Sequence, residues 1–201
     1  MADLNQFQDG QIGFIYHSKY GMNIMNIDTF WNLIDITRNA SGGNIPKQSD
    51  LLIEALAQGS VDEIFAFEKI MDDLMDNAYD AALWDAAYII GCGCGDDGFK
   101  DFRGWLIAQG KVVYEKALAD PESLVDLIEI NQDAQEGALL YVAITAYEQK
   151  TGREMPIRAI KINRPLPQLR GTNWAEEDKN TRFPILANKF GDCGQRHDLM
   201  W

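Results

Sequence analysis

Histidine and cysteine, which carry much of the acid–base, nucleophilic and zinc chemistry of proteins, are scarce in this chain of 201 residues. The two histidines, His17 and His197, lie near the ends, and neither a G-x-S-x-G nor an H-E-x-x-H motif is present. The three cysteines are an odd number in a chain of this length, which predicts reduced thiols rather than a disulfide framework. The sequence therefore favours a non-catalytic protein without a cofactor.

Long apolar runs are also lacking. No stretch approaches the ~18 to 20 consecutive apolar residues of a membrane span, and the first residues lack the basic region and apolar run of a signal peptide. We therefore expect a cytoplasmic protein with no membrane partner. With 46% hydrophobic and 24% charged residues, the chain can bury a full core as one domain.

Positive charge is the third scarcity. The chain has 18 Lys and Arg against 31 Asp and Glu, a net charge of -13, which argues against nucleic acid as a partner. Residues 60–150 carry 19 acidic and 6 basic side chains, whereas residues 151–201 carry 6 acidic and 9 basic ones. One interpretation is that a basic tail lies over an acidic helical body. The other is that an acidic helical face binds a basic protein partner.

Helical signals follow one another almost without interruption from Asp28, which is predicted to cap the first helix. Ser60 and Glu63 have the spacing of a capping box, and Asp80 is predicted to cap a helix over 81–90. That helix is apolar nearly all round, so its single polar residue, Asp85, is expected to be buried and to need a partner. Further helices are predicted after Pro46, Asp96 or Asp97, Gly110 and Asp120, with a last one over about 133–151.

These patterns predict a mainly α fold, with about seven or eight helices and an extended basic C-terminal tail. We expect an N-terminal extension over 1–27, a helical core domain over 28–152 and a tail over 153–201 that packs on the core. The tail holds most of the prolines and shows little periodicity.

Several sequence blocks carry a family resemblance. They are FW-x-L-I at Phe30–Ile34, LWDAAYII at Leu83–Ile90, GDDGF at Gly95–Phe99, FRGWLIAQG at Phe102–Gly110, ADPESL at Ala119–Leu124 and RFPILA at Arg182–Ala187. Together they resemble the bacterial domain-of-unknown-function 4240 family over roughly residues 28–190. The family has no established activity, so the resemblance implies only a tilt toward a binding or regulatory role.

Two constellations near the glycine-rich loop could bind a ligand. Cys92, Cys94, Cys193 and His197 are a complete tetrahedral zinc set, although their spacing lacks the C-x-x-C of zinc sites and small buried thiols are the simpler interpretation. The loop at 91–95 precedes a helix as a phosphate cradle would, but it lacks G-x-x-x-x-G-K-S/T and is followed by aspartates. A tight turn with an aspartate cap fits better.

A third constellation combines carboxylates, one arginine and aromatic residues. A buried Asp85–Arg103 pair that fixes helix packing is one interpretation, and a ligand or cation pocket with aromatic walls is the other. Asp97 and Asp101, four residues apart, can share a helix face. The candidate ligand or interaction residues are Trp84, Asp85, Tyr88, Asp96, Asp97, Asp101, Phe102, Arg103 and Trp105.

The sequence thus favours a binding or regulatory protein that acts through a protein partner or small ligand. A more specific version, based on charge and size, is an immunity-type or defence-associated protein that neutralises a basic partner. The alternative is an enzyme or metal-dependent site centred on Asp85, Asp97 and Arg103.

Overall fold

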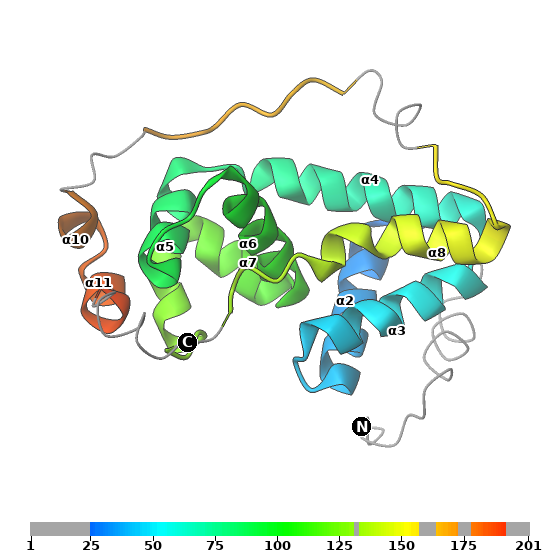
Figure 1. Cartoon of the computed structure of the whole chain (residues 1–201), viewed down its shortest axis with the longest axis horizontal. Helices are drawn as coiled ribbons and strands as arrows, with labels where there is room; N and C mark the ends of the chain where they lie inside the picture. Colours follow the sequence, from blue (N-terminus) through cyan, green and yellow to red (C-terminus); the bar gives the residue numbers. More distant parts are fainter. Residues whose placement is uncertain (1–24, 131–132, 157–163, 173–177, 192–201) are drawn as a thin grey trace. The chain divides into compact units, whose positions relative to one another are not determined.

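The computed structural model describes residues 25–130, 133–156, 164–172 and 178–191 (Figure 1). Within these ranges the fold is mainly α, as predicted, and the only β pairing is an isolated bridge between Asp80 and Arg170. The α-helices are α2 (Ile27–Ser41), α3 (Ile45–Gln58), α4 (Val61–Asn77), α5 (Ala81–Gly91), α6 (Asp96–Ala108), α7 (Lys111–Ala119), α8 (Val142–Thr151), α10 (Lys179–Arg182) and α11 (Pro184–Phe190). Two 3-10 helices, η2 (Pro121–Asp126) and η3 (Ala138–Tyr141), complete the described elements.

These elements form two compact units. The first contains α2, α3, α4 as far as Leu74, the residues 108–110, η3 and α8. The second contains α5, α6 as far as Ile107, α7, η2, α10 and α11. Among the described residues, no helix combines the length and apolar character needed to cross a membrane.

Helix ends follow from local side-chain chemistry, with one difference from the sequence prediction. The cap of α2 is Asn26 rather than Asp28, because the Asn26 side-chain oxygen accepts a hydrogen bond from the Thr29 amide at 2.9 Å. Asp28 lies in the first turn, where its charge still favours the positive end of the helix. The core of the first unit includes Phe30, Leu33, Ile34 and Leu52, all fully buried.

The predicted capping box at the start of α4 is confirmed. The Ser60 amide donates to Glu63 Oε2 at 2.6 Å, and the Glu63 amide donates to Ser60 Oγ at 3.1 Å. Two amides that α4 cannot satisfy internally are therefore bonded reciprocally.

We expect Ser60→Ala to lower the free energy of unfolding by about 1 kcal/mol, because it leaves the Glu63 amide without its acceptor. Ser60→Thr is the matched control, since threonine keeps the hydroxyl and should stay close to wild type. Urea unfolding followed by circular dichroism measures both variants. Equal stability of the alanine and threonine variants would show that the box contributes nothing.

Two predicted helices differ from the structure. The segment after Asp120 is the 3-10 helix η2, although Asp120 does cap it by accepting from the Glu122 amide at 3.1 Å. The helix predicted over 133–151 is α-helical only in α8 and is preceded by η3. Residues 133–137 are irregular because Asp133 bonds the Gln135 amide at 2.8 Å in a local turn and Gln135 reaches back to the Gly93 carbonyl at 3.4 Å.

Gly110 joins α6 to α7 in a conformation that favours glycine. Its φ is +94°, and a Cβ at this position would lie 2.5 Å from Asp35 Oδ1. A side chain here is therefore strained by its own backbone and also crowds a carboxylate.

We expect Gly110→Ala to destabilise the protein by about 1–3 kcal/mol, mostly through the positive φ. The matched control is Gly95→Ala, because a Cβ at Gly95 meets no atom within 4 Å and its φ is not positive. Thermal unfolding of the two variants tests the difference. A Gly110→Ala chain as stable as Gly95→Ala would contradict the strained conformation.

Candidate functional site

Asp85 is buried on α5, as the sequence predicts, but its partner is not the predicted one. The carboxyl group is 1% exposed, and its Oδ2 lies 2.6 Å from Nη1 of Arg182. The interpretation in which Asp85 pairs with Arg103 is therefore wrong. Arg182 also donates to the Thr172 carbonyl at 3.4 Å and lies over the Phe183 ring, 5.6 Å from its centroid. The partner of the Asp85 carboxylate thus lies at the end of α10, 97 residues further along the chain.

An ion pair with an arginine favours the charged form of a carboxyl group, but the rest of the environment of Asp85 favours its neutral form. Burial raises the pKa of the Asp85 carboxyl to about 7, the Arg182 charge opposes this rise, and the nearby Asp80 carboxylate adds to it. Asp80 itself caps α5 by accepting from the Ala82 amide at 2.9 Å, as predicted. Asp85 thus sits between one cation and one fixed anion near the start of the same helix.

Arg103 is buried and bonded to the backbone. Its Nη1 donates to the Met75 carbonyl at 2.8 Å and its Nε to the Phe99 carbonyl at 3.3 Å. The guanidinium lies between two rings, 4.9 Å from the centroids of both Tyr79 and Phe99. Burial lowers the pKa of Arg103, and the neighbouring Tyr79 and Asp76 oppose that change. Arg103 therefore acts as a side-chain cap for the last turn of α4.

The predicted aromatic walls pack against one another. Trp84 stacks on Phe99 with centroids 4.7 Å apart and rings 13° from parallel, and its indole N–H donates to the Cys94 carbonyl at 2.8 Å. Phe102 and Trp105 are each 1% exposed, and their centroids are 5.6 Å apart. Tyr88 is half-buried on α5. These rings contribute to the core of the second unit.

The glycine-rich loop accommodates the Gln135 side chain. A Cβ at Gly91 would lie 2.5 Å from Gln135 Nε2, and a Cβ at Gly98 would lie 2.5 Å from Gln135 Oε1. The amide group therefore occupies space that side chains at these two positions would fill. Asp96 and Asp97 lie in the first turn of α6, which begins at Asp96. The loop is a tight connection that receives a side chain, consistent with the simpler of its two interpretations.

The cysteines do not form the predicted set of reduced thiols. Cys92 is disulfide-bonded and adopts a left-handed conformation with φ of 53°, whereas Cys94 is a free thiol. Burial raises the pKa of the Cys94 thiol to about 12, and Asp101 adds to the rise, so Cys94 is held protonated. A disulfide-bonded Cys92 is not available as a thiolate ligand. Cys193 and His197 lie outside the described residues, as does His17.

In the parts of the chain that the structure describes, no three or more His, Cys, Asp or Glu side chains are arranged to hold a metal ion. The carboxylates near the start of α6 nevertheless lie close to one another. Burial raises the pKa of Asp101, Lys100 opposes the rise, and the charges of Asp97, Glu136 and Asp133 add to it. Asp96, Asp97 and Asp133 are exposed. We call Asp96, Asp97, Asp101 and Asp133 the α6 acidic surface.

Several basic residues of the tail contact acidic or polar groups of the helices. Arg164 Nη1 lies 2.8 Å from Asp73 Oδ1 on α4. Burial raises the pKa of Asp73, but hydrogen bonds from Lys69 and Arg164 outweigh it and leave the pKa lowered. Arg170 bonds Asn77 and lies 4.0 Å from Asp80 Oδ2, and its backbone pairs with the chain around Asp80. Within each unit, an arginine that follows the helices in sequence therefore contacts an acidic or polar group of those helices.

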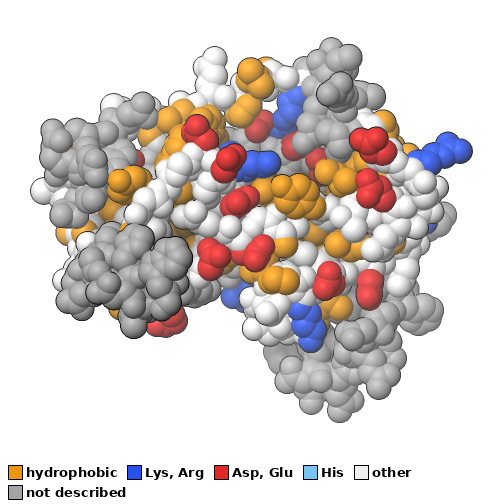
Figure 2. Space-filling model, viewed as in Figure 1, with side chains coloured by type: hydrophobic (Ala, Val, Ile, Leu, Met, Phe, Trp, Pro, Cys, Tyr) orange, Lys and Arg blue, Asp and Glu red, His pale blue; other side chains and the backbone are white. Residues whose placement is uncertain are grey.

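Within the described residues, no tail cation forms an ion pair with the α6 acidic surface. Among the described ion pairs, the carboxylates belong to Asp73, Asp80, Asp85 and Glu115, and none belongs to the four residues of that surface. Figure 2 shows acidic side chains distributed among apolar ones on the face in view. On this face most of the acidic side chains therefore stand apart from one another, with apolar side chains between them.

A hollow of about 280 Å³ lies beside α7 and η2, away from every predicted site residue. Its lining consists of Val112, Val113, Lys116, Ser123, Leu124, Asp126 and Leu127. Val112 is 79% exposed.

Sequence reasoning missed two residues, Arg182 and Gln135. Arg182 belongs to the RFPILA block that carried the resemblance, so its position was a usable signal for the partner of Asp85. Gln135 had no such signal, because a glutamine in a helical pattern looks like an exposed residue. Its role appears only once Gly91 and Gly98 are brought together.

In the second unit, two buried side chains connect helices. The Asp85 carboxylate joins α5 to α10, and the Arg103 guanidinium joins α6 to the last turn of α4. A family model described as "Protein of unknown function (DUF4240)" matches residues 25–149. Because the match covers more than half of the chain, the chain belongs to this family, as its sequence blocks predicted. The RFPILA block at Arg182–Ala187 lies outside the matched residues. No curated protein and no solved structure matches the chain.

Proposed function

We propose that this protein acts by binding a basic protein partner through the α6 acidic surface. The observation that carries the proposal is that Asp97 and Asp133 lie near Asp101, that Asp96 and Asp97 begin α6, and that none of these four carboxylates belongs to a described ion pair. Like charges held close together repel one another, and a basic partner relieves that repulsion on binding. Electrostatic attraction of this kind accelerates encounter and selects partners by charge.

The enzyme alternative centred on Asp85, Asp97 and Arg103 has less support. Asp85 is 1% exposed and paired with Arg182, and Arg103 is bonded to two backbone carbonyls. A catalytic group must reach a substrate atom within about 3 Å, either directly or through one water. Of the three residues only Asp97 is exposed, so a shared site for them lacks geometric support. An immunity-type role, in which the basic partner is neutralised, is one specific form of the proposed binding.

The test compares two variants of the full chain with equal charge changes. The first carries Asp96→Asn, Asp97→Asn and Asp133→Asn in the α6 acidic surface. The control carries Asp50→Asn, Glu54→Gln and Glu148→Gln on α3 and α8, all exposed. Partners are captured from a lysate of the source cells on immobilised wild type and identified by mass spectrometry. The affinity of each purified partner is then measured for all three chains by calorimetry.

We expect a partner with an excess of Lys and Arg whose affinity falls at least tenfold for the α6 variant and less than threefold for the control. Both variants should stay within about 1 kcal/mol of wild-type stability, since exposed substitutions rarely exceed that. Equal loss in both variants would mean that only net charge matters. No loss in either would place the binding surface elsewhere, and both results contradict the proposal.

A small apolar ligand is the second candidate, because the hollow beside α7 and η2 is lined mainly by Val, Leu and aliphatic stems. Val113→Asp, which places a carboxylate in the lining, tests it. A fluorescent apolar probe should no longer bind the Val113→Asp variant, but it should still bind the variant with the three α6 substitutions. Binding of the probe that is unchanged by Val113→Asp would remove this candidate.

A further inference from the structure

The segment 182–190 lies along α5 and η2 in the second unit. Figure 1 shows α10 and α11 beside α5, and α11 contacts both α5 and η2. Arg182 at the end of α10 meets Asp85 in the middle of α5, while the Phe190 carbonyl oxygen at the end of α11 lies 3.8 Å from Cys92 Sγ, just past the end of α5.

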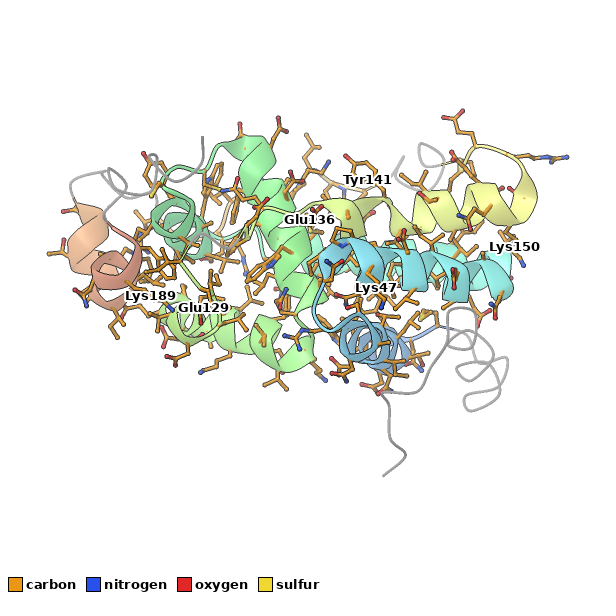
Figure 3. All side chains as sticks on the ribbon, turned by 60° about the horizontal axis from the view of Figure 1, so that its bottom comes forward. Lys47, Glu129, Glu136, Tyr141, Lys150 and Lys189 are labelled. Carbon is orange, nitrogen blue, oxygen red and sulfur yellow. The ribbon has the colours of Figure 1, made fainter. Side chains whose placement is uncertain are left out.

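Residues near both ends of α11 form hydrogen bonds with η2. Phe183, the residue before α11, has no polar side chain that could cap the helix. The Ile185 amide instead donates to Glu122 Oε1 at 2.6 Å. At the other end, Lys189 on α11 donates to the Val125 carbonyl at 2.7 Å (Figure 3). An acidic group thus meets the positive end of α11 and a cation occupies its last turn, which is the favourable arrangement for a helix dipole.

The buried side chains of the segment are Phe183, Leu186 and Phe190, and the last two are four residues apart on α11. Arg182 is the last residue of α10, and its side chain is 35% exposed. Ile185, on a different face, is 53% exposed. The segment therefore binds by one arginine from α10 and by three apolar side chains, of which Leu186 and Phe190 form the apolar face of the short amphipathic helix α11.

The surface that receives this segment belongs to the matched family region, whereas the segment does not. Asp85, Glu122 and Val125 lie within residues 25–149, and α10 and α11 follow 30 residues later. The receiving surface also carries the charge that suits a basic helix, since Asp80, Asp85 and Glu122 are acidic. We call α5 and η2, with Asp85 and Glu122 as its polar contacts, the α11-docking surface.

We propose that the α11-docking surface is a helix-binding site that α10 and α11 occupy in cis. Its partner is a short basic helix with an arginine followed at the fourth and eighth positions by large apolar residues. A tethered segment competes at an effective concentration of the order of millimolar, so a partner helix binds after the segment is displaced or weakened. This inference goes beyond the proposed function, because it concerns a different surface from the four carboxylates at α6.

The test uses a fluorescein-labelled peptide with the sequence of residues 179–191 and the full-length chain. Fluorescence anisotropy measures its binding to wild type and to Arg182→Gln/Leu186→Ser, in which the cis segment has lost one polar and one apolar anchor. A peptide carrying R182E and L186D is the matched control ligand. Because Cys92 is disulfide-bonded, each titration is run with and without a thiol reductant.

In reductant, we expect the variant to bind the peptide at least tenfold more tightly than wild type does, with no binding of the control peptide. Adding Asp85→Asn to the variant should lower its affinity for the peptide at least threefold. The α6 substitutions should leave peptide binding unchanged, so failure here and failure of the proposed function are separable.

The inference is overturned if the variant and wild type bind the peptide equally, or if the control peptide binds as well as the native one. Circular dichroism verifies that the double variant is folded. If it unfolds, Arg182→Gln alone gives the same test, since the Arg182 side chain is 35% exposed and its loss leaves Leu186 and Phe190 in place. In that case an affinity for the peptide no higher than that of wild type overturns the inference.

Discussion

Arg103→Ala should lower the free energy of unfolding by about 3 kcal/mol or more. The substitution leaves the buried Met75 carbonyl without its donor and empties the space between the Tyr79 and Phe99 rings. Loss of a charged hydrogen-bond donor to a buried acceptor costs about 1.5–3 kcal/mol, and lost packing adds to it. Urea unfolding followed by circular dichroism gives the value.

Arg103→Lys is the control for charge alone. Lysine keeps the positive charge but lacks the planar guanidinium that bonds both carbonyls and lies between the two rings. We therefore expect Arg103→Lys to recover less than half of the stability that Arg103→Ala loses. A residue retained for ligand binding would behave differently, because its removal commonly leaves stability unchanged or improved. An Arg103→Ala chain as stable as wild type would therefore return Arg103 to the list of functional candidates.

The second large effect concerns pH. Burial raises the pKa of the Asp85 carboxyl to about 7 in the folded chain from its ordinary value of 3.8, so the folded state binds more protons than the unfolded state between these values. Stability contributed by this group is therefore fully present below about pH 4 and is lost as pH rises through 7. Three pH units correspond to a change of at most about 4 kcal/mol.

The measurement is the difference in unfolding free energy between wild type and Asp85→Asn at a series of pH values from 4 to 8. We expect that difference to fall by about 2–4 kcal/mol over the range, because asparagine does not titrate. Arg182→Gln should move the transition to higher pH, since the Arg182 charge lowers the pKa of Asp85 whereas Asp80 raises it. A difference that stays constant with pH would show that Asp85 is ionised throughout.

Local patterns predicted the parts of the fold that local chemistry decides. The capping box at Ser60, the cap at Asp80 and the burial of Asp85 all follow from residues within a few positions of one another. The helix predicted over 133–151 failed because its first residues bond a turn and a distant loop instead of one another. Periodicity cannot register a competing contact of that kind.

The candidate cluster shows the same division. The sequence predicted that Asp85 needs a partner, and a buried pair with Arg103 was one of two interpretations of the cluster. In the structure Asp85 meets Arg182, and Arg103 meets the end of α4. Helical periodicity gives the face on which a side chain lies but not which distant segment covers that face. The disulfide at Cys92 escaped prediction for the same reason.

The salt dependence of partner affinity tests most directly the claim that the protein binds through a surface of unpaired carboxylates. The dissociation constant of the captured partner is measured for wild type at 50 and 300 mM NaCl, and again for the chain with Asp96→Asn, Asp97→Asn and Asp133→Asn. We predict that affinity for wild type falls at least tenfold with the added salt, because exposed charges are screened over about 10 Å or less, and that the variant loses most of this dependence. An affinity that is unchanged by salt, or that falls equally in both chains, would contradict the account.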